Sequence, residues 1–300
     1  METRKLAIVL PAYKSRFLKD TLDSIAAQTC RDFTLYVGDD ASPEPLQTMV
    51  YDYASRMDVV YHRFGQNLGG TDLVAHWERC IALSTEPLVW LFSDDDLMPP
   101  DGVERVLAAA ETEGLHRVMF RFPLQVVDAV GRVKSCNAPL SAGRTGGYEL
   151  LLAKLSGQLA SAAIEYVFSR DVCQTAGGFV HFPMAWCADD ATWATFADCA
   201  GGVVSLPGAP VCWRNAEGTN ISNTAAYDAE KLRATTQFLQ WLAVEYSGHC
   251  GDRRLKQALY AYLRVILRDS LQGRFNLLQL IRLASAARGV NAGVAWKVLY

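Results

Sequence analysis

Long uncharged runs, the mark of membrane-spanning helices, are missing from the 300-residue sequence. The two longest stretches without Asp, Glu, Lys or Arg cover residues 172–188 and 199–213, and prolines and glycines interrupt both. A transmembrane helix needs about 20 consecutive apolar residues, so we expect none. We expect no signal peptide either, because residues 1–5 lead straight into a short apolar run that Pro11 ends. These absences predict a cytoplasmic protein.

An excess of positive charge is also missing, because 29 Lys and Arg face 32 Asp and Glu and the net charge is −3. A general nucleic-acid binder would be strongly basic, so we expect no nucleic-acid partner. The eight cysteines include no C-x-x-C pair, which argues against a zinc site and favours free thiols in a reducing compartment. Hydrophobic residues make up 50% of the chain and charged residues 20%, the balance of a folded globular protein.

Strand-like and helix-like patterns alternate through the first 113 residues. Short apolar or β-branched runs predict strands at residues 6–10, 33–37, 59–61 and 88–92. Helical patterns are found at residues 18–25, 44–56, 72–84 and 99–113. Strands that alternate with helices through short connections form a mostly parallel sheet with helices on both faces. The predicted class is therefore α/β, with ligands bound beyond the carboxyl ends of the strands.

The remainder of the sequence is less regular and then becomes helical. Residues 118–122 and 126–127 suggest a pair of strands, and glycine-rich loops follow. From about residue 225 onward, leucines recur at helical spacing. We therefore expect a Rossmann-like catalytic domain over residues 1–220 and a helical C-terminal extension over residues 221–300.

Acidic residues concentrate where the predicted strands end. Asp39-Asp40 follows the second strand, and Asp94-Asp95-Asp96 follows the fourth. In extended chain, Asp94 and Asp96 would face the same side. Hard oxygen ligands at the edge of an α/β sheet suit Mg²⁺ or Mn²⁺ that holds a phosphate group. The alternative is a solvated acidic turn at the start of a helix, where Asp is favoured.

A third acidic pair, Asp189-Asp190, lies within a largely apolar and aromatic segment, residues 186–193. A carboxylate beside apolar groups gains basicity through desolvation, which suits a general base. The alternative is that one of the two residues caps the helix that follows.

Four segments together resemble the family 2 glycosyltransferases of the GT-A fold. They are residues 8–13 (Ile-Val-Leu-Pro-Ala-Tyr), 37–42 (Val-Gly-Asp-Asp-Ala-Ser), 67–69 (Asn-Leu-Gly) and 92–100 (Phe-Ser-Asp-Asp-Asp-Leu-Met-Pro-Pro). The resemblance covers residues 5–110 well and extends through Asp189-Asp190 to Trp213-Arg214. It implies a GT-A fold with a C-terminal helical region and inverting, non-processive transfer of a sugar from a nucleotide-diphosphate sugar, with UDP as the expected nucleotide.

The resemblance also implies roles for individual residues. The nucleotide-sugar contacts implied are Pro11, Ala12, Tyr13, Asp39, Asn67, Asp94 and Asp95. The Asp-x-Asp motif maps onto residues 94–96, so Asp96 and Asp94 are the implied ligands of Mn²⁺ or Mg²⁺. Asp190 matches the catalytic base, with Asp189 in support. The implied acceptor is a saccharide or a lipid-linked saccharide, as in bacterial surface polysaccharide or glycolipid assembly.

The sequence departs from the family pattern in several places. Asp-Ala-Ser replaces the usual Asp-Gly-Ser at residues 40–42, Asp189 stands where Glu is usual, and no His follows Trp213-Arg214 closely. Residues 237–241 (Gln-Phe-Leu-Gln-Trp) differ from the Gln-x-x-Arg-Trp motif of processive synthases by having Gln240 in place of Arg.

Two rival functions remain at this point. A nucleotidyltransferase would carry a glycine-rich, basic loop after the first strand, whereas residues 11–15 contain no glycine. A non-catalytic nucleotide-sugar-binding relative would be expected to lose the acidic clusters, and all three are present.

The C-terminal region is strongly basic. Residues 251–300 contain nine Lys or Arg and two Asp, so this segment carries +7 and the remainder carries −10. Residues 274–288 combine Leu, Ile and Phe with Arg274, Arg282 and Arg288 and contain no acid. Such a helix either lies on the inner face of an anionic membrane or packs on the catalytic domain with its arginines in solvent.

Overall fold

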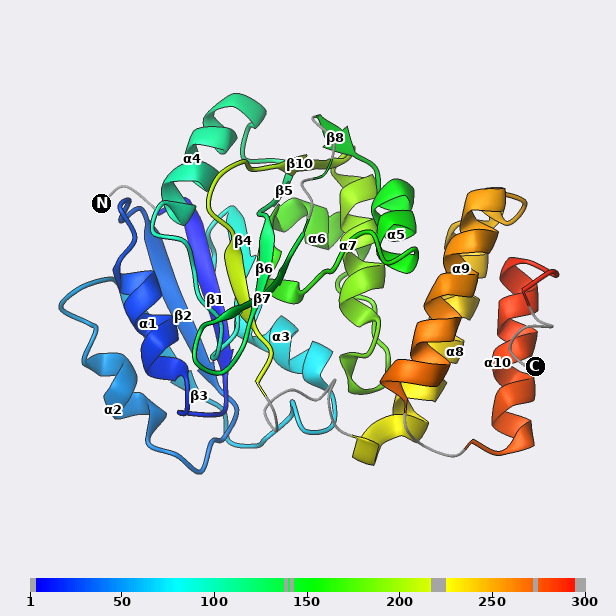
Figure 1. The fold of residues 1–300 in the computed structure, drawn as a ribbon. Helices are drawn as coiled ribbons and strands as arrows, with labels where there is room; N and C mark the ends of the chain where they lie inside the picture. The colour runs from blue at the N-terminus through cyan, green and yellow to red at the C-terminus, as the bar shows by residue number, and fades with distance from the viewer. Residues whose placement is uncertain (1–3, 138–139, 141–142, 217–224, 272–274, 295–300) are drawn as a thin grey trace.

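The computed structural model describes residues 4–137, 140, 143–216, 225–271 and 275–294. An eight-stranded sheet forms its centre (Figure 1). In sheet order the strands are β3 (Val59–Arg63), β2 (Phe33–Asp39), β1 (Leu6–Ala12), β4 (Leu88–Leu91), β9 (Tyr166–Ser169), β5 (Met119–Arg121), β10 (Val203–Ser205) and β8 (Arg144–Thr145). Strands β3, β2, β1 and β4 are mutually parallel, β9 is antiparallel to both β4 and β5, and β10 is parallel to β5. The predicted α/β class with a mostly parallel sheet is confirmed.

Helices cover both faces of the sheet because side chains alternate along each strand. Leu6, Ile8 and Leu10 of β1 join a hydrophobic cluster with α1, α2 and α4, whereas Ala7 and Val9 face a second cluster with α3 and α5–α10. The helices are α1 (Leu18–Ala26), α2 (Leu46–Tyr51), α3 (Leu73–Ile81), α4 (Gly102–Glu113), α5 (Gly147–Leu155), α6 (Arg170–Ala176), α7 (Ala188–Cys199), α8 (Asp228–Glu245), α9 (Arg253–Val265) and α10 (Leu277–Val290). The strands and helices expected over the first 113 residues are therefore present, although α2 is shorter than its sequence pattern.

The prediction that residues 118–122 and 126–127 form a pair of strands is wrong, because the two strands do not pair with each other. β5 belongs to the large sheet, whereas β6 (Leu124–Val127) lies between β7 (Val133–Cys136) and β11 (Val211–Arg214) in a separate three-stranded sheet. Only Phe122 and Pro123 separate β5 from β6, and they continue the chain instead of turning it back. Pro123 also lacks the N–H that a sheet ladder needs. The chain therefore passes from one sheet directly into the other.

Helices α5 and α7 pack against each other in opposite directions. α7 ends just before β10, which is parallel to the central strands, so the C-terminal end of α7 lies at the amino edge of the sheet. β8 is antiparallel to β10 and leads into α5 at the same edge. The last turn of α5 and the first turn of α7 consequently lie together, toward the carboxyl edge.

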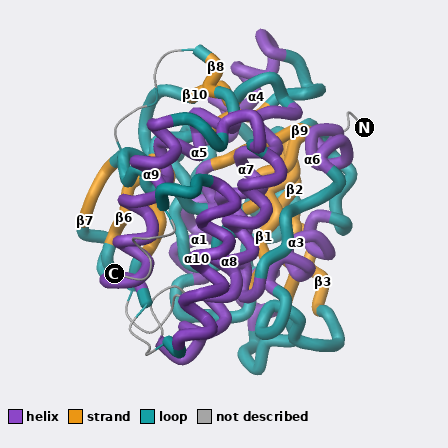
Figure 2. The backbone as a smooth tube through the Cα atoms, turned by 90° about the vertical axis from the view of Figure 1, so that its right-hand side faces the viewer, coloured by secondary structure: helices purple, strands orange, loops and turns teal. Residues whose placement is uncertain are grey.

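The C-terminal helices α8, α9 and α10 lie side by side beyond α5 and α7 (Figures 1 and 2). Their buried residues join the same hydrophobic cluster as one face of the sheet. The expected domain boundary at residue 220 lies outside the described residues, and the division into two domains stays a prediction. No helix within the described ranges is long and apolar enough to cross a membrane.

Helix α10 packs against α8 and exposes an apolar turn on its other side. Leu283, Ala287 and Val290 are buried against the rest of the molecule. Leu277 and Ile281, by contrast, are 69% and 48% exposed, and Arg282 and Arg288 are exposed as well. Arg274, the first arginine of the predicted membrane-binding segment, lies outside the described residues.

Gly147 allows α5 and α7 to approach closely, and we expect Gly147→Ala to destabilise the protein. An added Cβ would lie 2.1 Å from the carbonyl oxygen of Ala194, and such overpacking costs roughly 1–3 kcal/mol. Gly146→Ala is the matched control, because its added Cβ would meet nothing closer than 3.9 Å. Urea unfolding should show a lower midpoint for Gly147→Ala alone, and equal midpoints for the two variants would contradict this packing.

Candidate active site

The parallel strands bring the predicted nucleotide-binding residues to one edge of the sheet. Pro11 and Ala12 at the end of β1 are in register with Gly38 and Asp39 at the end of β2. Tyr13 follows directly, is 40% exposed, and accepts a hydrogen bond from Ser42 Oγ at 2.6 Å through its carbonyl oxygen. The loops after β1 and β2 therefore form one surface, as a shared nucleotide site requires.

Asp39 is fully buried and already hydrogen-bonded at both oxygens. Its Oδ1 accepts from the backbone N–H of Ser42 at 2.7 Å, and its Oδ2 accepts from Tyr61 Oη and from Arg63 Nη1, the latter at 2.8 Å. Burial and the bond to Asp39 raise the pKa of Tyr61 above its ordinary value, so the phenol stays protonated as a donor. A nucleotide base would have to share Asp39 with these donors or displace Arg63, which is half-exposed.

Asp40, to which the family resemblance gave no individual role, holds the loop that contains Asn67. Its carboxylate accepts hydrogen bonds from the N–H groups of Leu68 and Gly69 at 2.7 and 2.8 Å and pairs with Arg79. Asn67 Nδ2 donates to the carbonyl oxygen of Asp40 at 3.2 Å. The second Asp of the pair thus places Asn67 beside the nucleotide-binding edge. Its doubled position after β2 was the available sequence signal.

The three carboxylates after β4 are held by two different elements. Asp94 Oδ2 accepts from the backbone N–H groups of Tyr13 and Lys14 at 2.8 and 2.9 Å. Asp96, whose exposure is 1%, accepts from the backbone N–H of Arg214 at 2.6 Å. Asp94 and Asp95 form a turn, so the extended-chain argument for a common face of Asp94 and Asp96 does not apply here.

These carboxylates have a donor set that fits a divalent cation. Burial and the charge of Asp95 raise the pKa of Asp94 to about 6, and burial and the charges of Asp95 and Asp94 raise the pKa of Asp96 well above its ordinary value. Among the described residues, no hydrogen bond reaches Asp94 Oδ1 or Asp96 Oδ2. A cation would compensate this repulsion. Within the described residues, no group of three or more His, Cys, Asp or Glu forms a metal cage by itself.

Asp95 lies between the two predicted metal ligands and is held in a different way. Its Oδ1 accepts a hydrogen bond from Ser93 Oγ at 2.8 Å, and its carbonyl oxygen accepts from Arg214 Nε at 2.8 Å. Burial raises the pKa of the Asp95 carboxyl. Arg214 therefore binds two consecutive residues of the turn and fixes β11 to the end of β4.

Asp189 and Asp190 occupy the first turn of α7, where the backbone N–H groups favour negative charge. Burial and the neighbouring charge of Asp190 raise the pKa of Asp189 to about 7. Asp190 Oδ1 instead lies 3.1 Å from Nζ of Lys154. The N-cap residue of α7 is Cys187 and neither aspartate occupies that position, so the capping alternative is not what the structure shows.

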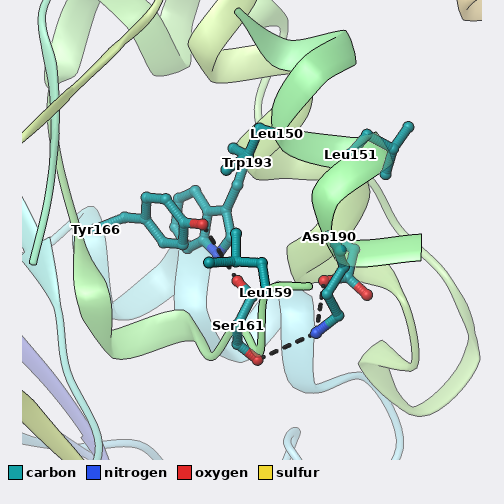
Figure 3. Close-up of a pocket in the computed structure, with 8 residues that line it drawn as sticks. Leu150, Leu151, Leu159, Ser161, Tyr166, Asp190 and Trp193 are labelled. Atoms are coloured by element: carbon teal, nitrogen blue, oxygen red, sulfur yellow. Dashed lines mark hydrogen bonds and ion pairs between the residues drawn. The ribbon is translucent and has the colours of Figure 1, made fainter. Parts of the chain in front are cut away.

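A small recess separates Asp190 from the stacked rings of Tyr166 and Trp193 (Figure 3). Leu150 and Leu159 complete its apolar wall, and the free space of about 10 Å³ is what one water molecule needs. A recess of this size is too small for a sugar.

Lys154 is the functional candidate that sequence analysis missed. It is the one charged residue among the leucines at positions 150–155, and that isolation was the only signal. A lysine on a helix is most often a solvated residue, and only tertiary packing places this one against Asp190.

The sequence of residues 7–138 matches the model of the family "Glycosyl transferase family 2". No curated protein sequence is similar enough to this chain to count as a match. Among solved structures, S. aureus TarS residues 1–349 is 14% identical with a TM-score of 0.62, and the match covers 98% of this chain and 82% of that one.

Two further solved structures carry ligands. S. aureus TarS residues 1–349 in complex with UDP-GlcNAc is 16% identical with a TM-score of 0.65, over 94% of this chain and 79% of that one. The mannosyltransferase PcManGT from Pyrobaculum calidifontis, in complex with GDP-Man and Mn²⁺, is 17% identical with a TM-score of 0.52, over 95% and 73%.

The mixed sheet, its flanking helices and the carboxyl-edge loops define a GT-A glycosyltransferase fold. Together with the family match over residues 7–138, they support a glycosyltransferase whose N-terminal part is similar to family 2.

Proposed function

We propose that this enzyme transfers a sugar from a nucleotide-diphosphate sugar, with UDP as the expected nucleotide, to an acceptor hydroxyl with inversion and without processivity. The observation that carries the proposal is that the β1 loop and the Asp94–Asp96 turn are joined at the carboxyl edge of the sheet, and that the first turn of α7 lies toward the same edge. The family match and the UDP-GlcNAc and GDP-Man complexes of structural neighbours support it.

The donor would bind across the loops that follow β1, β2 and β4. Pro11, Ala12 and Tyr13 offer backbone groups and an aromatic ring, and Asp39 lies beside them. The remaining proposed contacts are Asn67, Asp94 and Asp95. The two N–H groups that bind Asp94 belong to residues 13 and 14, so the metal-binding turn and the base-binding loop are held as one unit.

Asp94 and Asp96 would hold Mn²⁺ or Mg²⁺. When bound, the cation would supply a Lewis acid that neutralises charge on the diphosphate. The buried Asp96 is anchored by the backbone of Arg214, and Arg214 is itself packed over the ring of Phe17 at 4.3 Å. The carboxylate oxygens that would coordinate the cation are therefore positioned before the cation or the donor binds.

The proposed base is Asp190, and Asp189 supports it. The carboxylate of Asp190 takes the proton of the acceptor hydroxyl as its oxygen bonds to the anomeric carbon. The bond between that carbon and the diphosphate breaks at the same time, and the nucleoside diphosphate leaves with the bonding electrons. Attack from the face opposite the leaving group inverts the configuration, and no covalent enzyme intermediate is needed.

Nucleoside diphosphate binding should depend on a divalent cation and on Asp96. In calorimetry, Mn²⁺ should strengthen UDP binding by the wild type, and Asp96→Ala should remove that gain, because the variant lacks a proposed ligand. Asp52→Ala, which removes an exposed carboxylate on α2's C-terminal end, is the control and should keep the metal effect. Equal UDP affinity with EDTA and with Mn²⁺ would overturn the metal assignment.

Asp190→Asn should lower the rate of transfer by about 10²–10⁴-fold, the usual contribution of general acid–base catalysis. The amide keeps the size of the carboxylate but does not accept the proton. Donor affinity should barely change, because the proposed donor contacts lie on other loops. Asp189→Asn is the matched variant and should lower kcat less than Asp190→Asn does. If Asp189→Asn is inactive and Asp190→Asn turns over normally, the two roles must be exchanged.

We also propose that α10 touches an anionic membrane surface, where a lipid-linked acceptor would be found. The exposed Leu277, Leu278 and Ile281 lie on a helix with the exposed cations Arg282 and Arg288. An exposed apolar turn with basic neighbours matches the chemistry of an anionic lipid interface.

Removing two charges from α10 should weaken vesicle binding. Each basic residue near an anionic surface contributes about 1 kcal/mol, so Arg282→Ser with Arg288→Ser should lower binding roughly 30-fold. Arg31→Ser with Arg132→Ser removes two exposed arginines elsewhere and serves as the control. Sedimentation with phosphatidylserine vesicles measures both, while activity on a soluble acceptor should survive. If the intact protein stays in solution at low salt, the membrane proposal is wrong.

A further inference from the structure

Lys154 makes two polar contacts in a largely apolar recess. Its Nζ lies 3.1 Å from Asp190 Oδ1 and donates a hydrogen bond to the carbonyl oxygen of Ser161 at 3.2 Å. The Lys154 side chain is 24% exposed and that of Asp190 is 11% exposed, so solvent screens the pair only weakly. Figure 3 shows Asp190 beside Leu159 and Ser161, with the ion pair drawn as a dashed line.

The packing of two helices sets this contact. Gly147 at the start of α5 donates its N–H to Asp198 Oδ1 at 2.7 Å near the end of α7. Because the helices run in opposite directions, fixing this end brings the last turn of α5 to the first turn of α7. Lys154 thereby meets Asp190 through the packing of the two helices, and its partly buried amine is offset by this pairing.

A chain of alternating charges continues from this pair into the core. Burial opposes the charge of Lys154, but Asp190, Asp189 and Glu165 outweigh that effect and raise the pKa of the lysine. Glu165 in turn pairs with Arg121 on β5 at 2.8 Å, and both are buried. Lys154 therefore stays positively charged between Glu165 in the core and the aspartate pair in the first turn of α7.

Among the described residues, Cys187 and Tyr262 also face the aspartate pair, and both are neutral. Burial raises the pKa of Cys187, which precedes the pair on its own chain, and of Tyr262 on α9. Their Sγ and Oη atoms lie 3.0 Å apart. Lys154 on α5 thus offsets the negative charge of the aspartate pair, and the Glu165–Arg121 ion pair lies deeper in the core.

We propose that Lys154 is the positioning residue of the catalytic base: its ammonium group, held by the packing of α5 on α7, fixes the Asp190 side chain and offsets the negative charge of the aspartate pair. The inference rests on the proposed function of Asp190. Without the ammonium group, two adjacent carboxylates in an apolar recess would repel each other, and the proton shared by the pair would be retained to higher pH.

The test compares pH profiles of kcat for the wild type, Lys154→Met and Lys154→Arg. Loss of an opposite charge within about 4–6 Å is worth roughly 1–3 pH units, so the acid limb of Lys154→Met should move upward by at least about one unit. Its kcat at neutral pH should fall roughly tenfold or more, with the donor KM unchanged. Lys154→Arg restores the charge and should return the acid limb toward that of the wild type.

Further variants separate this role from simple support of the fold. Lys154→Gln keeps an N–H donor for the Ser161 carbonyl and should show the same upward shift as Lys154→Met, which also covers the case that the Met variant does not fold. Lys19→Met removes an exposed lysine with an i,i+4 ion pair and should leave the profile unchanged. Adding Lys154→Met to Asp190→Asn should cost no further activity, because both act through one carboxylate.

The outcomes distinguish this inference from the proposed function. If the wild type turns over no nucleotide sugar, the proposed function is wrong, and so is the role of Lys154. If the wild type is active and Asp190→Asn is not, but Lys154→Met and Lys154→Gln keep the wild-type pH profile, Lys154 is only structural. An equal loss of kcat at every pH, without movement of the acid limb, would likewise overturn the inference.

Discussion

Strands β2 and β4 end at one edge of the sheet with five carboxylates, and the site depends on how this negative charge is held. Each carboxylate is stabilised differently. Asp40 binds the N–H groups of a neighbouring loop, Asp39 binds Arg63, and Asp94 and Asp96 bind backbone N–H groups of β1's loop and of β11. The same bonds that offset the repulsion also join the loops into one surface. The five carboxylates therefore repel one another, and the bonds that offset this repulsion also organise the site.

The second acidic group, Asp189 and Asp190, lies on a helix that covers one face of the sheet. Helices α5 and α7 bring Lys154 and the Asp189–Asp190 pair together, and the apolar cluster beneath them extends into α8, α9 and α10. The C-terminal helices thus support the helix that carries the proposed base. This continuity gives a physical reason for changes in the C-terminal helices to affect the proposed catalysis as well as the proposed membrane contact.

Local patterns in the sequence were sufficient to predict the α/β core. Alternation of apolar runs with helical periodicity located β1 to β4 and α1 to α4, because each of these elements is encoded by its own residues. The pairing of β5 and β6 was not predictable, since it depends on partners more than 40 residues away on β9 and β11. Asp94 and Asp96 were recognisable as a motif, but the turn at residues 94–95 was not.

Tertiary contacts decide the remaining features of the site. Nothing local to Asp39 indicates that Tyr61 and Arg63 occupy its oxygens, because both come from β3. Lys154 differs from a surface lysine only through the helix that packs on it. The family resemblance supplied roles for Asp190 and Asp96, whereas the interactions that tune these carboxylates required the fold.

Turnover of nucleotide sugars is the measurement that tests the central claim most directly. The purified protein is incubated with a panel of UDP- and GDP-linked sugars, with Mn²⁺ or with EDTA, and release of the nucleoside diphosphate is followed. We predict release from at least one donor with Mn²⁺, suppression by EDTA, and little release by Asp190→Asn. Absence of release from every donor, or release that is equal with EDTA and in Asp190→Asn, would contradict it.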